Sequence, residues 1–244
     1  MIDLHCHLCF GVDDGPKSAA EALELARALQ GAGITEVACT PHVRPDKGWM
    51  NTAPGQAALH RALDEVLGEA GVTLPHRRGA EHYFDAQVFE EPLDGKVVPY
   101  GDSRWLLVEL PYAGAPPDLF GPLFRLRQRG YRVLLAHLER YPYVVDDEDL
   151  VERLVSAGYL VQVNLGSLAG AYTRAHRKAA ERLVTRGFAA VASGDCHRAA
   201  DVAPFVEKGL KALKKLAGDD AVRRLTVDNP RAILDDAPSE RVWP

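Results

Sequence analysis

The sequence lacks an apolar run long enough to cross a membrane and lacks a basic stripe typical of nucleic-acid binding. Its 29 Lys and Arg residues are outnumbered by 34 Asp and Glu residues, which gives a net charge of -5. The N-terminus shows neither the basic region nor the sustained apolar region of a signal peptide. We therefore expect a cytoplasmic protein that does not insert into membranes and does not use nucleic acid as a partner.

Cysteine is also scarce, with four residues in 244, at Cys6, Cys9, Cys39 and Cys196. Their spacing does not form a disulfide framework, and three of them lie in apolar strand-like runs, which predicts reduced thiols. None is followed by a glycine-rich phosphate loop that ends in arginine. This absence argues against catalysis by a cysteine nucleophile.

What the sequence does contain is a steady alternation of short apolar runs and amphipathic helical patterns. Strands are expected at 1–7, 34–40, 72–81, 104–110, 131–137, 159–165 and 188–195. Helical patterns between and after them include one near 22–29, one near 59–67 and a final helix capped by Asn229. This alternation predicts one α/β domain over residues 1–244 with a parallel sheet, closed into a barrel of seven βα units.

Polar side chains end nearly every expected strand. They are His5 and His7 with Asp14 in the following loop, then His42, Glu81, Glu109, His137, Asp195 and His197. In a parallel barrel the carboxyl ends of all strands meet at one rim, where the active sites of such barrels lie. Residues spread over almost the whole chain are thus expected to meet at one mouth.

These residue types favour divalent metal ions, and bridging carboxylates favour more than one ion. Alternation along a strand turns His5 and His7 to the same side and turns Cys6 to the other, and Cys196 repeats this arrangement between Asp195 and His197. A lone HxH motif is often incidental, and a buried Glu can simply pair with Arg. So many buried like charges without a cation would nevertheless be very costly, which predicts a multinuclear metal site.

The other histidines, at positions 60, 76, 82 and 176, are expected to be solvated on helices or in polar loops. His82 stands out among them because it follows Glu81. The loop around 44–55 carries Trp49 and Met50, which we expect to help hold a peptide.

Several motifs resemble a known family. HxH near the N-terminus, DDGP, GAE, AHxER and a late DxH are similar to the polymerase-and-histidinol-phosphatase (PHP) superfamily. Finer details, including MIDLHCHLCFGVDDGPKS, LLAHLERY and YLVQVNLGSL, resemble the PHP-type bacterial tyrosine phosphatases of capsule and exopolysaccharide synthesis.

The resemblance implies a distorted seven-stranded (β/α)7 TIM-like barrel with three divalent ions, manganese first, with iron or zinc as alternatives. The implied ligands are His5, His7, Asp14, His42, Glu81, Glu109, His137, Asp195 and His197. Arg140 matches an arginine near the phosphate, although an ion pair with Glu139 or a nearby Asp is an alternative role for it. The family commonly has a second arginine several residues beyond DxH, whereas here Arg198 follows His197 directly, so Arg198 is the candidate for a second substrate-binding arginine.

The implied activity is metal-dependent hydrolysis of a phosphotyrosine protein, namely the tail of a bacterial tyrosine kinase. His42 or a metal-bound water is the expected proton donor to the leaving group. Two alternatives remain at this point: a histidinol-phosphate phosphatase of the same fold, and a non-catalytic regulatory binding module.

Overall fold

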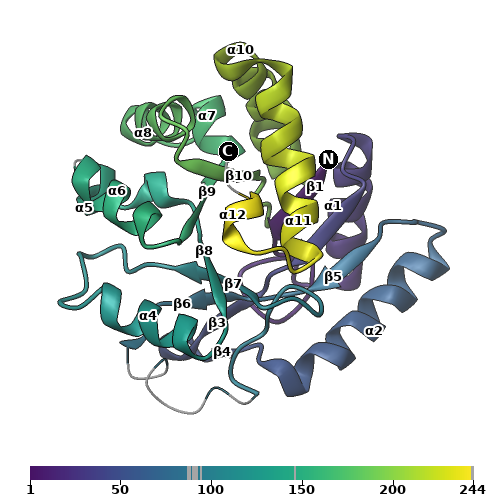
Figure 1. Ribbon diagram of the computed structural model, residues 1–244. Coiled ribbons are helices and arrows are strands. Elements are labelled where there is room, and N and C mark those ends of the chain that lie inside the picture. The colour runs from purple at the N-terminus through teal and green to yellow at the C-terminus, as the bar shows by residue number, and fades with distance from the viewer. Residues whose placement is uncertain (87–88, 90–92, 94, 146, 243–244) are drawn as a thin grey trace.

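The computed structural model describes residues 1–86, 89, 93, 95–145 and 147–242 (Figure 1). Its strands are β1 (Ile2–Cys6), β2 (Glu36–Cys39), β3 (His42–Arg44), β4 (Trp49–Met50), β5 (His76–Arg78), β6 (Glu81–Tyr83), β7 (Trp105–Glu109), β8 (Arg132–Leu135), β9 (Leu160–Asn164) and β10 (Ala189–Ser193). Each run that the sequence predicted to be a strand contains one. The third run contains β5 and the first residue of β6, whereas β3 lies beyond the end of the second run and follows β2 after a two-residue break.

The strands form two sheets. One has the order β1-β2-β5, and the other has the order β10-β9-β8-β7-β6-β3-β4. Every pairing is parallel except that of β3 with β4, which is a short antiparallel pair. The parallel α/β class is therefore confirmed, whereas the ladders do not close into one seven-stranded barrel.

The two sheets meet where β1 approaches the end of β10. An isolated parallel bridge joins Cys6 to Cys196. The amide of Asp195 donates to the carbonyl of His5 at 2.8 Å, and the amide of His7 donates to the carbonyl of Cys196 at 3.0 Å. This junction brings the first and last predicted ligand motifs side by side.

Helices surround the strands (Figure 1). They are α1 (Ala19–Gly31), α2 (Ala53–Glu69), α4 (Phe120–Gln128), α5 (Pro142–Val145), α6 (Glu148–Ser156), α7 (Leu165–Ala169), α8 (Arg174–Thr185), α9 (Ala199–Val202), α10 (Lys208–Arg223), α11 (Asn229–Leu234) and α12 (Ser239–Val242). None of the helices in the described part of the chain combines the length and apolarity that a membrane span requires.

Helix α1 illustrates how local sequence sets these elements. The Ser18 hydroxyl caps its first turn by accepting from the amide of Glu21, and the predicted apolar stripe, which includes Leu25 and Leu29, is fully buried. The predicted cap at Asn229 is wrong. The chain enters α11 directly from a π-helical turn, Arg224–Asp228, with Asn229 already helical, and the Asn229 side chain instead donates to the carbonyl of Ala190 at 2.7 Å.

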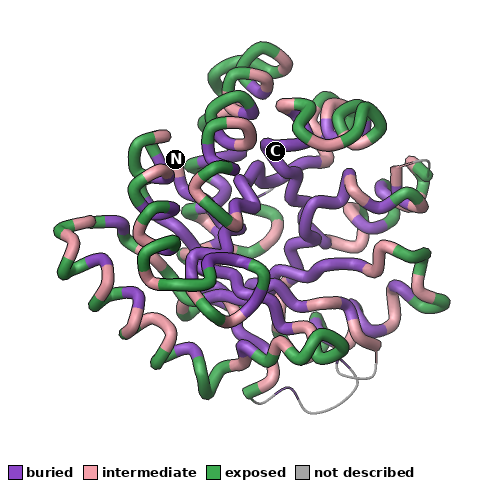
Figure 2. The backbone as a smooth tube through the Cα atoms, turned by 180° about the vertical axis from the view of Figure 1, so that it is seen from behind, coloured by how far each residue is buried: buried purple, intermediate pink, exposed green. Residues whose placement is uncertain are grey.

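The central strands are buried along most of their length, whereas the helices are buried on one side only (Figure 2). Cys6 and Cys196 are fully buried in the main apolar cluster, as predicted for strand packing. Polar side chains at the strand ends are therefore held by a rigid, water-poor framework.

Candidate metal centre

Glu81, the first residue of β6, is almost completely buried at the middle of the polar cluster. Its Oε2 lies 3.2 Å from His5 Nε2 and 3.4 Å from His7 Nε2. The same oxygen lies 3.1 Å from His42 Nδ1, and Oε1 lies 2.9 Å from His137 Nε2. Four imidazoles from distant parts of the sequence thus converge on one carboxylate, as the strand-end pattern predicted.

The outer part of the cluster is built around Asp14. Its Oδ1 lies 3.3 Å from His197 Nε2 and 3.5 Å from His42 Nε2. The ring of His197 stacks on that of His7, with centroids 3.9 Å apart. Because the Asp14 side chain is about half exposed, this part of the cluster faces the surface of the protein.

The remaining predicted ligands complete the inner part. Asp195 Oδ1 lies 3.3 Å from His5 Nε2, and Glu109 Oε2 lies 3.9 Å from His42 Nδ1. Ligand atoms come within 4.8 Å of one another in four sets, namely His7-Asp14-His42-His197, His5-His7-Glu81, His5-His137-Asp195 and His42-Glu81-Glu109. All nine predicted ligand positions therefore belong to one cluster with room for more than one cation.

The candidate ligand atoms do not satisfy one another by hydrogen bonding, and bound cations would satisfy them better. His5 Nε2 and His7 Nε2 face each other at 3.4 Å, where one hydrogen at most can be shared. Glu109 Oε2 and His42 Nδ1 are buried and lack a hydrogen bond within the described residues. Buried polar atoms left in this state are costly, and a divalent ion would satisfy them.

The pKa values of the clustered side chains also favour a bound cation. Burial would lower the pKa of His5, but the carboxylates of Glu81 and Asp195 outweigh it and raise that pKa to about 9. Burial, followed by the nearby Glu81, raises the pKa of Glu109 to about 8. The metal-free cluster thus retains protons at neutral pH, and these are the protons that a bound cation displaces.

Two candidate ligands have unusual backbone conformations. His137 has φ 32° and Asp195 has φ 52°, both in the left-handed region that residues other than glycine rarely adopt. Each follows the end of a parallel strand and turns its side chain toward Glu81 or His5. Such strain is characteristic of positions that are held in place for function.

Asp13, which the sequence analysis passed over in favour of Asp14, lies beneath His7. Its Oδ2 accepts from His7 Nδ1 at 2.8 Å and from the amide of His42 at 2.9 Å. Its Oδ1 accepts from the amide of Gly15 at 2.9 Å. Of the two adjacent acidic residues in DDG, Asp14 is therefore a candidate ligand, whereas Asp13 orients the candidate ligand His7.

A second missed set lies on β9. His5 Nδ1 donates to Gln162 Oε1 at 3.1 Å, and Gln162 Nε2 donates to Asn164 Oδ1 at 2.7 Å. Asn164 Nδ2 in turn donates to Asp195 Oδ2 at 2.7 Å. The available signal was the spacing of two amides, two residues apart, in an otherwise apolar strand.

Arg140 lies at the mouth of the cluster. Its Nη1 is 3.3 Å from Asp195 Oδ2, and its guanidinium lies over the rings of Tyr112 and Tyr172 at 5.3 and 5.0 Å. Glu139 instead accepts from Ser167 Oγ and the amide of Asn164. Arg140 Nε is buried without a hydrogen bond among the described residues, which leaves the guanidinium a donor for a further anion.

Arg198 is placed differently. Its side chain is 77% exposed, and its Nε contacts Asp201 Oδ1 at 3.1 Å. It lines a smaller neighbouring cavity of about 200 Å³ together with Arg140 and Tyr172, and it is not among the residues that line the main pocket.

The main pocket, about 380 Å³, opens directly over the cluster. Three residues that were not predicted as site residues also line it, namely Arg44, Lys47 and Tyr112. Trp49 also lines it, and its ring stacks on that of His42 at 5.1 Å, whereas Met50 is largely exposed. The pocket therefore combines a floor of ligand-type side chains, basic groups suited to an anion and aromatic walls.

The expectation that His82 is solvated is wrong. It is 2% exposed, its Nδ1 donates to the carbonyl of Leu107 at 2.9 Å and its Nε2 accepts from the amide of Val98 at 3.0 Å. His82 follows Glu81 on β6 and therefore points away from the cluster.

The sequence from residue 1 to 235 matches the family model described as capsular polysaccharide synthesis, CpsB/CapC. The chain is 29% identical to tyrosine-protein phosphatase CpsB of Streptococcus pneumoniae over 243 residues, covering 97% of this chain and 99% of that protein. It is 28% identical to tyrosine-protein phosphatase YwqE of Bacillus subtilis, covering 96% and 91% of the two chains.

The fold also matches a solved structure. It comes from work on YwqE of Bacillus subtilis and CpsB of Streptococcus pneumoniae, described as unique metal-dependent tyrosine phosphatases. The TM-score is 0.89 at 26% sequence identity, and the match covers 97% of this chain and 95% of that one.

Proposed function

The chain belongs to the capsular polysaccharide synthesis CpsB/CapC family, and from this membership we propose that it is a metal-dependent protein-tyrosine phosphatase. The observation that carries the proposal is the gathering of nine ligand-type side chains, with Glu81 in their middle, beneath a pocket that Arg140 also lines. The relatives that match along nearly the whole chain are named tyrosine-protein phosphatases, which supports this activity over histidinol-phosphate hydrolysis.

The proposed metal ligands are the nine residues predicted from the sequence, and we propose that they hold three divalent ions. Manganese is our first assignment, with iron or zinc as alternatives, since this His and carboxylate set accepts all three. Such a centre, held by these residues, would supply a bound water with a pKa of about 7 and positive charge to neutralise phosphoryl oxygens.

The protein groups around the centre have separate roles. Arg140 is placed to donate to an equatorial phosphoryl oxygen, and its stacking between Tyr112 and Tyr172 holds the guanidinium in position. Arg44 and Lys47 supply further positive charge at the pocket wall. We propose that these two residues take the second anion-binding role, which the family resemblance implied for an arginine beyond the DxH motif.

Trp49 and Tyr112 present aromatic surface at the same pocket, which suits the phenyl ring of phosphotyrosine. His42 is better suited to ligation than to proton donation, because burial lowers its pKa and favours the neutral imidazole. A phenolate with a pKa of about 10 leaves with less protonation than an alkoxide, so this substrate requires little from a dedicated acid.

We further propose a cytoplasmic, single-domain enzyme over residues 1–244 whose substrate is the phosphorylated tail of a bacterial tyrosine kinase in capsule synthesis. We also propose that its two sheets are a distorted (β/α)7 barrel. The interrupted strand pairs β2/β3 and β5/β6 each count as one barrel strand, and the Cys6–Cys196 bridge marks the seam.

The test compares turnover of a phosphotyrosine peptide, a phosphoserine peptide and histidinol phosphate by the manganese-loaded protein. We expect preference for phosphotyrosine, loss of activity with a chelator and recovery on adding manganese. Preference for histidinol phosphate would reject the substrate assignment. No hydrolysis of any ester after reconstitution would favour a non-catalytic binding module.

A further inference from the structure

Two cysteines and a histidine gather on the side of the sheet that faces α2. Cys9 follows β1, Cys39 ends β2, and His60 lies on α2, and their ligand atoms are all within 4.8 Å of one another. Both thiols are reduced and buried. The group is one of the metal-ligating sets in the described chain, and none of its members belongs to the centre around Glu81.

Buried cysteines by themselves are ordinary core residues, so the case depends on His60. Its Nε2 is buried and has no hydrogen-bond partner among the residues that the structure describes. Burial, followed by the nearby His76, lowers the pKa of His60 to about 4, so the imidazole is neutral and keeps a free lone pair at neutral pH. A neutral imidazole with an unused nitrogen beside two thiols is the arrangement that a metal ion satisfies.

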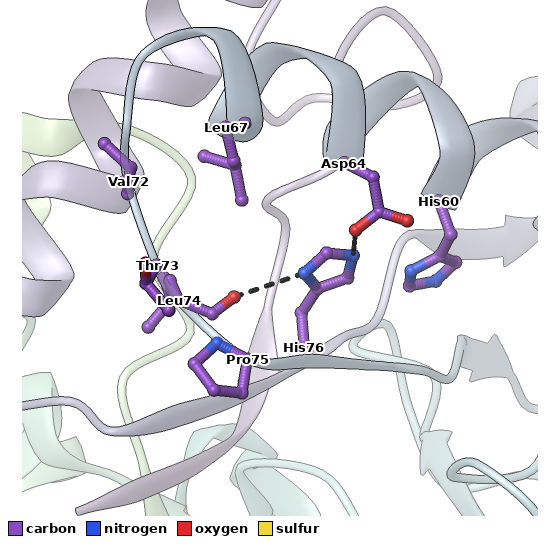
Figure 3. Close-up of a pocket in the computed structure, with 9 residues that line it drawn as sticks. His60, Asp64, Leu67, Val72, Thr73, Leu74, Pro75 and His76 are labelled. Carbon is purple, nitrogen blue, oxygen red and sulfur yellow. Dashed lines mark hydrogen bonds and ion pairs between the residues drawn. The ribbon is translucent and has the colours of Figure 1, made fainter.

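The neighbouring His76 does not supply that partner. Its ring stacks on the ring of His60 at 5.1 Å, while its Nε2 faces Asp64 at 3.5 Å and its Nδ1 contacts the carbonyl of Leu74 at 3.2 Å (Figure 3). Both nitrogens of His76 are therefore engaged, whereas His60 points a nitrogen into the interior.

An open cavity of about 450 Å³ reaches His60 from the surface, although neither cysteine lines it. It lies between α2 and the segment that leads into β5, and His60, Asp64 and His76 line it (Figure 3). A small hydrated ion can thus reach His60 without unfolding of the core.

We propose that Cys9, Cys39 and His60 form a second metal site that binds one Zn²⁺. Two thiolates and one imidazole are soft to borderline ligands that select zinc over manganese, magnesium or calcium. The site differs in chemistry from the centre around Glu81, where the gathered ligands are nitrogen and oxygen.

Such an ion would link the segment after β1, the end of β2 and helix α2. Cys9 is two residues beyond His7, and Cys39 is three residues before His42. A bound zinc ion would therefore restrain the two segments that carry His7 and His42, which are candidate ligands of the main centre. The inference concerns metal binding only and holds whether or not the proposed phosphatase activity is found.

Cobalt provides the first test, because a cobalt–thiolate bond gives a charge-transfer absorption in the near ultraviolet that nitrogen and oxygen ligands do not give. We expect this band when the reduced full-length protein is titrated with Co²⁺. The Cys9→Ser/Cys39→Ser double variant should lose it, and His60→Ala should weaken Co²⁺ binding at this band about tenfold or more.

Matched variants are available in the same chain. Cys196→Ala removes a buried thiol outside the group, and His76→Ala removes the adjacent imidazole, so both should retain the band. A saturated wild-type protein without the band, or a band that survives the double cysteine change, would overturn the proposal.

A second measurement needs no variant and is therefore independent of folding defects. The protein is first loaded with manganese, then given one equivalent of Zn²⁺ and studied by X-ray absorption at the zinc edge. Sulfur scattering at about 2.3 Å supports the site. A shell of nitrogen and oxygen alone would place the zinc at the main centre and reject it.

Discussion

Asp13 Oδ2 and His7 Nδ1 lie 2.8 Å apart, and this contact decides which nitrogen of His7 faces the metal centre. Because Nδ1 donates to the carboxylate, Nε2 is the nitrogen that faces Glu81 and His5 and that would be available to a metal ion. Burial would raise the pKa of Asp13, but the interaction with His7 outweighs it and holds that pKa well below its usual range. Asp13 is therefore ionised wherever the enzyme works, and it acts as a positioning residue for His7.

Replacing Asp13 with Asn should weaken metal binding about 10- to 100-fold, because the orienting charge on His7 is lost while the side chain keeps its size. Competition with a chelating dye measures the affinity directly. Asp102→Asn, which changes a fully exposed carboxylate, should leave the affinity unchanged. Equal affinities of the Asp13 and Asp102 variants would show that the contact has no part in holding the metal.

Arg140→Ala should lower kcat/KM for a phosphotyrosine peptide about 100-fold or more, since the proposed charged donor to the phosphoryl group, which is partly buried, is removed. Arg140→Lys should recover only part of this loss, because an ammonium group cannot make the bidentate contact. Arg198→Ala is the matched control, and its exposed side chain predicts a change of about threefold at most. A larger loss for Arg198 than for Arg140 would reverse the two roles.

Arg44→Ala should act mainly on KM, which we expect to rise about three- to tenfold, roughly 1 kcal/mol of binding. Arg44 lies over the Tyr83 ring at 4.1 Å, and its Nη1 is 3.5 Å from Glu109 Oε2, so its charge is held at the pocket wall beside the buried cluster. Steady-state kinetics at two salt concentrations separates the effects, because screening should shrink the difference. A fall in kcat with KM unchanged would instead place Arg44 in the chemical step.

The gathering of the site was predictable because topology alone brings the ends of parallel strands to one rim. His5, Glu109 and Asp195 needed only a correct strand assignment to be placed together. The division of labour between Asp13 and Asp14 was not predictable, since two adjacent residues of one type differ only in burial. That difference depends on two backbone amides that donate to Asp13, one from Gly15 in the same loop and one from His42 in β3.

The misplacement of His82 has a similar cause. Its partners, the Leu107 carbonyl and the Val98 amide, lie 25 and 16 residues away in the sequence, and no local pattern indicates them. Asn229 likewise had the sequence of a helix cap, but a continuous π-helical turn left it no extended backbone to cap from. Local propensity gave way to tertiary packing in both places.

His82 also predicts how stability depends on pH. Burial lowers its pKa to about 4 in the folded protein, whereas an unfolded chain takes up the proton near 6.5. Between these values the unfolded state binds more protons, so the free energy of unfolding falls as the pH drops from about 6.5 toward 4. Above about pH 6.5 both states are neutral at this position, and His82 adds no pH dependence.

The His82→Gln variant isolates this contribution, because glutamine is polar but does not titrate. From urea unfolding of the metal-free proteins, we expect wild-type to lose about 2 kcal/mol more than the variant between about pH 7.5 and pH 5. Other carboxylates and histidines affect both proteins alike, so the difference between the two curves is the quantity to compare. Parallel curves would mean that His82 becomes protonated in the folded state at its ordinary pKa, which its two buried hydrogen bonds should prevent.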